Sequence, residues 1–155
     1  MSTIIGIDPG KTGGLSLWVG GVYETTKPIP IIKGKSKSEY DIRNFVDLLT
    51  DWDSFMSPPF VYVEKVHAMP KQGVSSCFTF GEGYGIIKGV LSAMGLNYEL
   101  VTPQRWTKTV CMDLPGTDNK QRVKVLMSQK FPQVKIPQYL YDAFLIGYWG
   151  TLQGR

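Results

Sequence analysis

The stretch Ile4-Ile5-Gly6-Ile7-Asp8-Pro9-Gly10, near the start of the chain, decides the fold that we expect. It is apolar up to an aspartate, a pattern typical of a short buried strand over residues 4–8. After a glycine-rich turn, the alternation of residues 15–19 predicts a second strand. Gly20-Gly21 is a hairpin signal, and a third strand is expected at residues 22–27. The chain therefore opens with a three-stranded meander.

Helices and strands alternate after this meander. The pattern predicts a polar loop at 33–38, then a helix capped by Ser38 and running to about Phe55, and a strand at 60–64. A helix at 76–95 and a strand at 98–102 follow. The rest of the chain is expected to form a short helix from Pro103, a basic helix from Thr117 or Asp118 to about Lys130, and a last helix at 139–152. The 155 residues suit one domain, and a hydrophobic share of 43% is enough for a sizeable core. We therefore predict a single α/β domain over residues 1–155, ribonuclease H-like, with a five-stranded mixed sheet flanked by helices.

The helix expected at residues 76–95 carries three interior glycines, Gly81, Gly85 and Gly89, at four-residue spacing. An interior glycine costs a helix about 1 kcal/mol relative to alanine, so three on one face indicate that another backbone approaches closely. Either packing on the sheet or a contact with a second copy of the chain would explain the alignment. The pattern Gly81-x-Gly83-x-Gly85 is no dinucleotide motif, because no strand leads into it at the required spacing.

Composition excludes several classes of protein. No apolar run approaches the roughly 20 residues that a membrane helix needs, and the first residues lack the segments of a signal peptide. We therefore expect a cytoplasmic protein with no membrane partner. Cys77 and Cys111 lack zinc spacing and His67 is the only histidine, so we expect two reduced thiols and no zinc site.

Positive charge is concentrated in residues 103–135. This stretch holds seven lysine or arginine residues against two aspartates, whereas the whole chain has a net charge of only +4. A localised basic surface indicates a polyanionic partner such as nucleic acid. From charge alone, a solvated helix face is an equally good explanation.

Three carboxylates stand alone in apolar surroundings at distant points of the chain: Asp8, Glu64 and Asp142. Asp8 and Glu64 each end a predicted strand, and adjacent strands could bring them within about 5–8 Å of each other. A packed terminal helix could supply Asp142. Each residue alone could be an ordinary surface acid, but together they predict one shared site. Hard oxygen ligands without a His or Cys cluster indicate Mg²⁺, with Mn²⁺ as a substitute.

Several segments resemble the RuvC-type Holliday-junction resolvases, a family of crossover junction endodeoxyribonucleases. The catalytic segments of that family are matched, in order and spacing, by Gly6-Ile7-Asp8-Pro9-Gly10, by Val63-Glu64-Lys65-Val66 and by Tyr141-Asp142-Ala143-Phe144-Leu145-Ile146. The bacteriophage branch of the family is matched by Met69-Pro70-Lys71-Gln72-Gly73, by Phe80-Gly81-x-Gly83-Tyr84-Gly85 and by Val101-Thr102-Pro103-Gln104-x-Trp106.

This resemblance implies a RuvC-like nuclease domain that forms a homodimer, binds four-way DNA junctions and cuts them by metal-dependent phosphodiester hydrolysis. It makes Asp8, Glu64 and Asp142 metal ligands and places Lys108 and Lys120 near the scissile phosphate. The residues that we expect to contact DNA are His67, Met69, Lys71, Arg105, Lys108, Lys120, Arg122 and Lys124. In the family, the loop after the strand glutamate wedges into the junction. Here His67 could stack on a base, or it could be a solvated loop residue.

One departure from the family lies at Tyr139, where a further Asp or His ligand is usual, three residues before the last aspartate. No carboxylate or histidine lies between Asp118 and Asp142, so water, Gln138 or Asp118 would have to complete that metal site. The alternative function is therefore a catalytically weak protein that binds branched DNA on the same fold. A nucleotide-binding protein of the actin-like superfamily is disfavoured by the small size, and we expect no nucleotide cofactor.

Overall fold

The computed structural model describes residues 2–53, 57–67 and 73–155 of the chain. Its central sheet consists of β1 (Thr3–Asp8), β2 (Gly14–Val19), β3 (Val22–Pro28), β6 (Phe60–Glu64) and β7 (Asn97–Val101). These strands lie in the order β3-β2-β1-β6-β7, with β1 antiparallel to β2 and parallel to β6. The predicted meander and the predicted five-stranded mixed sheet are both confirmed.

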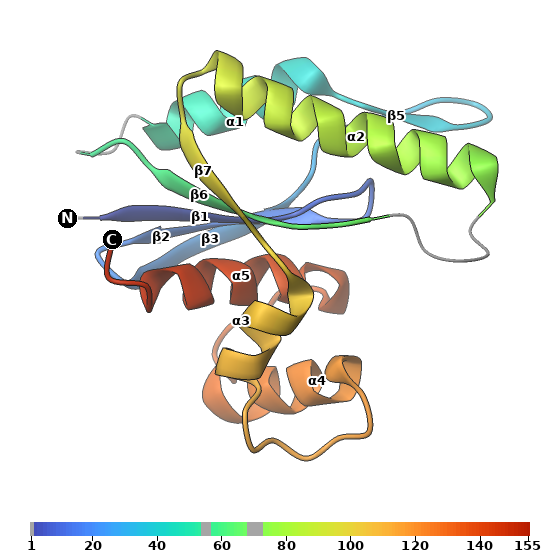
Figure 1. The fold of residues 1–155 in the computed structure, drawn as a ribbon. Coiled ribbons are helices and arrows are strands. Elements are labelled where there is room, and N and C mark those ends of the chain that lie inside the picture. Colours follow the sequence, from blue (N-terminus) through green and yellow to red (C-terminus); the bar gives the residue numbers. More distant parts are fainter. Residues whose placement is uncertain (1, 54–56, 68–72) are drawn as a thin grey trace.

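Helices cover both faces of this sheet (Figure 1). They are α1 (Ile42–Asp53), α2 (Val74–Ala93), α3 (Pro103–Val110), α4 (Asn119–Lys130) and α5 (Tyr141–Thr151), with a short 3-10 helix η1 (Gln138–Leu140) before α5. α1 and α2 lie on one face, whereas α5 lies on the other with α3 and α4 beyond it (Figure 1). Each face has its own apolar core, since Ile5 and Ile7 pack on one side and Ile4 on the other. Among the described residues, no helix is both long and apolar enough to cross a membrane.

The polar segment at residues 33–38 differs from the expected loop. Its ends belong to β4 (Ile31–Lys33) and β5 (Ser38–Tyr40), which pair antiparallel in a small hairpin. Ser38 therefore lies in a strand, and its prediction as a helix cap is wrong. Asp41 caps α1 instead, because its Oδ1 accepts a hydrogen bond of 3.1 Å from the Asn44 backbone N–H. The expected helix end near Phe55 lies outside the described residues.

The aligned glycines of α2 do not pack on the sheet. Gly81, Gly85 and Gly89 are exposed, and a Cβ at any of them would meet no heavy atom within 4 Å. Gly83, which has no place in that alignment, is instead buried against the Tyr40 ring. Sheet packing is thus the wrong explanation for the alignment, and contact with a second copy stays a prediction.

Two facing glycines let α5 lie directly on β1. A Cβ on Gly6 would lie 2.6 Å from the Gly147 Cα and 2.8 Å from the Ala143 carbonyl oxygen. Ser16 of β2 donates a hydrogen bond of 2.7 Å to that same carbonyl oxygen. These contacts hold the first turn of α5, which carries Asp142, against the sheet.

Candidate active site

Asp8 and Glu64 end two neighbouring parallel strands. Ile7 of β1 pairs with Val63 of β6, so the next residue of each strand is a carboxylate at the same edge of the sheet. Asp142 is the second residue of α5, and the packing of α5 on β1 brings it to this edge. The structure therefore brings together the three carboxylates that the sequence predicted as one site.

Burial and mutual repulsion raise the pKa values of these three groups. Burial is the main cause that raises the pKa of Asp8, and the charges of Glu64 and Asp142 raise this pKa further. The pKa of Glu64 is raised to about 7, mainly by burial; a hydrogen bond from Trp106 opposes this shift, and the charge of Asp142 adds to it. Burial also raises the pKa of Asp142, against the opposing effect of the Lys120 ammonium. Buried carboxylates that repel one another form a site that a cation would stabilise.

Trp106 of α3 belongs to this site, although nothing in the sequence assigned it a role there. Its indole Nε1–H donates a hydrogen bond of 2.7 Å to Glu64 Oε2, and its side chain is only 2% exposed. A buried indole N–H requires an acceptor, which is the one signal that could have pointed to a polar partner. Which acceptor it finds depends on where α3 lies in space, and the local sequence does not determine that.

A groove runs past the carboxylates. Its central pocket, about 120 Å³ in volume, lies between Glu64 and Asp142 and is also lined by Lys120. Lys120 and Asp142 also line a neighbouring pocket of about 450 Å³, together with Tyr139. On its other side, the central pocket shares Thr107 with a pocket of about 570 Å³ between α3 and α4. Because neighbouring pockets share lining residues, we consider the three together and call them the carboxylate groove.

Four of the predicted DNA-contacting residues line the carboxylate groove. They are Lys108, Lys120, Arg122 and Lys124. Lys120 is the one that lies in the central pocket, where its charge acts on Asp142. Lys108 and Arg122 line the pocket between α3 and α4, and Lys124 lines the pocket on the opposite side. Positive side chains therefore flank the carboxylates on both sides.

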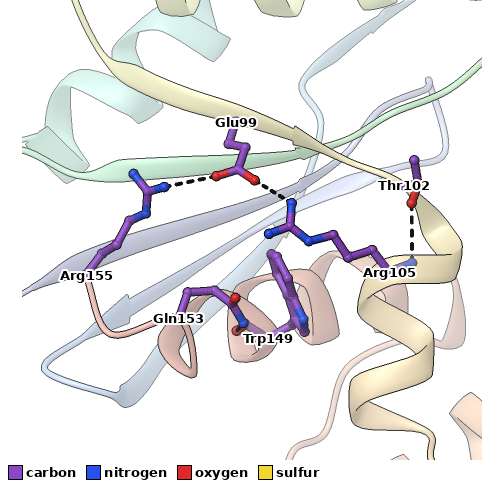
Figure 2. A network of polar contacts seen from close by, with 6 residues as sticks. All are labelled: Glu99, Thr102, Arg105, Trp149, Gln153 and Arg155. Atoms are coloured by element: carbon purple, nitrogen blue, oxygen red, sulfur yellow. Dashed lines mark hydrogen bonds and ion pairs between the residues drawn. The ribbon is translucent and has the colours of Figure 1, made fainter.

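Arg105 is engaged in a different part of the molecule (Figure 2). Its Nη1 lies 2.6 Å from Glu99 Oε1, and its guanidinium lies over the Trp149 ring, 5.1 Å from the centroid. Arg155 contacts the other oxygen of Glu99 at 3.1 Å (Figure 2). These contacts tie α3 to β7 and α5, a role that the charge pattern did not indicate. A DNA contact by Arg105 stays a prediction.

The loop after β6 carries the other predicted DNA contacts. His67 is exposed, three residues beyond Glu64, where a DNA strand could reach it. Met69 and Lys71 lie outside the described residues. Contacts of these three residues with DNA stay predictions.

The residues considered for the missing metal ligand lie in different places. Asp118 caps α4, since its Oδ1 accepts a hydrogen bond of 2.9 Å from the Gln121 backbone N–H. Gln138 and Tyr139 line the carboxylate groove beside Asp142, and Tyr139 is 52% exposed. Gln138 is therefore better placed than Asp118 to add an oxygen ligand near Asp142.

The oxygen donors of Asp8, Glu64 and Asp142 suit Mg²⁺ in their chemistry. As these side chains stand, no group of three or more His, Cys, Asp or Glu residues within 2–53, 57–67 and 73–155 is gathered closely enough to hold a metal ion. The three carboxylates would have to lie closer together to bind one ion.

Comparisons with known proteins relate the chain to others through its structure. No protein-family model matches the sequence, and no curated protein sequence matches it. The structure is similar to T. thermophilus RuvC in complex with Holliday junction substrate, with a TM-score of 0.64 and 15% identity over 96% of this chain and 92% of that one. Another Thermus thermophilus RuvC structure has a TM-score of 0.57 and 17% identity, over 95% of this chain and 92% of that one. Fowlpox virus resolvase with its Holliday junction DNA has a TM-score of 0.46 and 15% identity, over 96% of this chain and 98% of that one. The likeness to RuvC over nearly the whole of both chains shows that this chain has the RuvC fold, which is ribonuclease H-like.

Proposed function

We propose that this chain is a structure-selective DNA endonuclease that resolves four-way (Holliday) junctions by metal-dependent phosphodiester hydrolysis, with other branched DNA as further substrates. The observation that carries the proposal is the convergence of Asp8, Glu64 and Asp142 at one edge of the sheet. Glu64 and Asp142 line the carboxylate groove, together with basic side chains. The two T. thermophilus structures of the same fold support it, since one of them is described with a Holliday junction as substrate.

Asp8, Glu64 and Asp142 would hold Mg²⁺, with Mn²⁺ as a substitute. Bound there, the metal would polarise the phosphodiester and stabilise the charge that develops on it. Lys120, in the same pocket as Asp142, would hold a non-bridging phosphate oxygen. Gln138 would take the place of the ligand that the resemblance expects at Tyr139.

The carboxylate groove suits one nucleic-acid strand. With one phosphate of the DNA strand at the central pocket, the strand would pass Lys108 and Arg122 in one direction and Lys124 in the other. Each of these cations would neutralise a backbone phosphate and release counterions. We expect the proposed activity in the cytoplasm, which is the host cytoplasm if a bacteriophage encodes the chain.

We also propose that two copies associate through an exposed face of α2. The dimer face consists of Val74, Phe78, Gly81, Gly85 and Gly89. Val74 is 87% exposed and Phe78 is 75% exposed, and these apolar side chains lie on the same helix face as the glycines. Since nothing lies within 4 Å of a Cβ at the three glycines, a helix of a second copy could approach closely there.

The second candidate function is a catalytically weak protein that binds branched DNA. Tyr139 favours it, because this tyrosine occupies a position where a metal ligand is expected. One assay distinguishes the two candidates. Binding and cleavage of a synthetic four-way junction are measured in Mg²⁺ and in Mn²⁺, with a linear duplex of the same sequence as control substrate. The enzyme cleaves the junction selectively, and Asp8→Asn or Glu64→Gln abolishes cleavage while binding remains. Asp47→Asn, which alters an exposed acid of α1, serves as the matched control. Binding without cleavage in either metal would favour the second candidate.

A further inference from the structure

The hydrogen bond between Trp106 and Glu64 joins a core side chain to the candidate active site. The indole Nε1–H and Glu64 Oε2 are 2.7 Å apart, across a sequence separation of 42 residues. Trp106 is 2% exposed and belongs to the same buried core cluster as Val123 of α4 and Phe144 of α5. The donor therefore sits on a ring that cannot move without repacking the core.

Local structure explains why the indole reaches this carboxylate. Val101, the last residue of β7, pairs with Glu64, and its carbonyl oxygen accepts a hydrogen bond of 2.6 Å from the Lys65 backbone N–H. Thr102 then caps α3, its hydroxyl accepting from the Arg105 backbone N–H at 3.3 Å, with Pro103 at the first helical position. Trp106 thus lies one helical turn from the strand that neighbours Glu64.

Contacts on its outer side hold α3 in place. Arg105, next to Trp106, pairs with Glu99 of β7 at 2.6 Å and lies over Trp149 of α5 (Figure 2). The helix is therefore attached both to the edge of the sheet and to the helix that carries Asp142. A donor held on such a support can restrict the orientation of the group that it binds.

We infer that Trp106 is a positioning residue for Glu64, whose carboxylate it orients for a divalent cation in the pocket shared with Asp142. This inference rests on the metal site of the proposed function. A free glutamate side chain has several rotatable bonds, and ordering them opposes metal binding. With Oε2 held by the indole, the carboxylate keeps one orientation, and Oε1 is free of this hydrogen bond. Hydrogen bonds of this kind to metal-binding carboxylates commonly change metal affinity about 10- to 100-fold.

The test measures Mn²⁺ binding to the DNA-free full chain by calorimetry, together with the rise in melting temperature that Mn²⁺ produces. Trp106→Phe removes the N–H while keeping an aromatic ring. Trp52→Phe makes the same change in a buried tryptophan of α1, in the core on the other face of the sheet. We expect Trp106→Phe to weaken Mn²⁺ binding about 10- to 100-fold and to lose most of the thermal shift. Trp52→Phe keeps the Mn²⁺ affinity of the wild type, whatever it costs in stability.

Two further measurements separate positioning from packing. Replacing Trp106 by its benzothiophene isostere keeps the shape of the ring and removes only the N–H, so it should reproduce the loss even if Trp106→Phe folds poorly. In Glu64→Gln protein, Trp106→Phe should have little further effect on Mn²⁺ affinity, because the group that it positions is already changed.

The possible outcomes separate this inference from the proposed function. Unchanged Mn²⁺ affinity in both Trp106 variants would overturn the positioning role, even if the wild type cleaves junctions. Trp106-dependent Mn²⁺ binding without junction cleavage would support the role and contradict the proposed reaction. A wild-type chain that binds no Mn²⁺ would overturn both.

Discussion

Gly6 and Gly147 face each other where α5 crosses β1, so closely that a Cβ on Gly6 would lie 2.6 Å from the Gly147 Cα. This backbone contact sets the height of α5 above the sheet. It thereby sets the position of Asp142, five residues before Gly147, relative to Asp8 at the end of β1. The geometry of the candidate site therefore depends on Gly6 and Gly147, whose lack of a side chain lets α5 lie close to β1.

Gly6→Ala should therefore reduce both stability and activity. Overpacking a core commonly costs about 1–3 kcal/mol, and we expect at least the upper end here because the clash is with backbone atoms. Urea unfolding measures the change. The control is Gly73→Ala at the N-cap of α2, where a Cβ meets nothing within 4 Å and the backbone conformation suits alanine, so a change within about 1 kcal/mol is expected. Equal losses in the two variants would contradict the close packing of α5.

The pKa of Glu64 predicts how the stability of the metal-free protein changes with pH. Its folded-state pKa, about 7, lies above its ordinary value of 4.5, so the folded state binds the proton more tightly than the unfolded state does. Glu64 therefore favours folding at low pH, and this contribution disappears as the pH rises from about 4.5 through 7. The raised pKa values of Asp8 and Asp142 act in the same direction.

We accordingly expect the free energy of unfolding in EDTA to fall between pH 5 and pH 8, with Glu64 contributing at most about 3 kcal/mol. Glu64→Gln should flatten this slope and make the metal-free protein more stable at pH 8, whereas Asp47→Asn should leave the slope unchanged. Saturating Mg²⁺ should restore stability at pH 8 in the wild type. A stability that rises steadily over this pH range would show that the carboxylates are not buried together.

The basic side chains of the carboxylate groove predict a strong effect of salt on DNA affinity. The logarithm of the affinity for a four-way junction should fall linearly with the logarithm of the salt concentration, and Arg122→Gln or Lys124→Gln should reduce the slope by about 1 each. Lys33→Gln, on the exposed hairpin strand β4, is the control and should leave the slope unchanged. Fluorescence anisotropy at several salt concentrations measures this, and a flat response would remove the groove from the DNA path.

The dimer face of α2 can be tested by making it too bulky for close approach. Gly85 is exposed, with nothing within 4 Å of a Cβ, so Gly85→Leu should leave each copy folded while it disrupts the dimer. Thr50→Leu places the same leucine side chain at an exposed position of α1. Light scattering should show a monomer for Gly85→Leu and a dimer for Thr50→Leu. A folded and dimeric Gly85→Leu protein would count against this face.

Local patterns were enough to predict the five strands of the central sheet and the three carboxylates. Asp8 and Glu64 end apolar runs, and strand ends at one edge of a sheet meet whenever the strands are parallel neighbours. The error at Ser38 arose because β5 is only three residues long and its pairing with β4 leaves little periodicity to detect. Asp41, three residues after Ser38, is also a residue type that caps helices, and it is the one that caps α1.

The sequence could not show the roles of Trp106 and Arg105, because both depend on how α3 lies against the sheet and α5. In sequence, Arg105 is one of several cations in a basic stretch, and only the folded chain places it against Glu99 and Trp149. The alignment of the α2 glycines was visible in the sequence, but which surface faces them was a question of tertiary structure.

Metal-activated cleavage of a four-way junction by the wild type and by Asp142→Asn, under single-turnover conditions, tests the proposed endonuclease most directly. Asp142 comes from a helix and not from the sheet, so its role depends most on the folded arrangement described above. We expect the wild type to cleave the junction in Mg²⁺ or Mn²⁺. We expect Asp142→Asn to cleave it at least about 10³-fold more slowly while retaining junction affinity, since several kcal/mol of metal-assisted stabilisation would be lost. Equal rates for the two proteins, or no cleavage by the wild type in either metal, would contradict the proposed function.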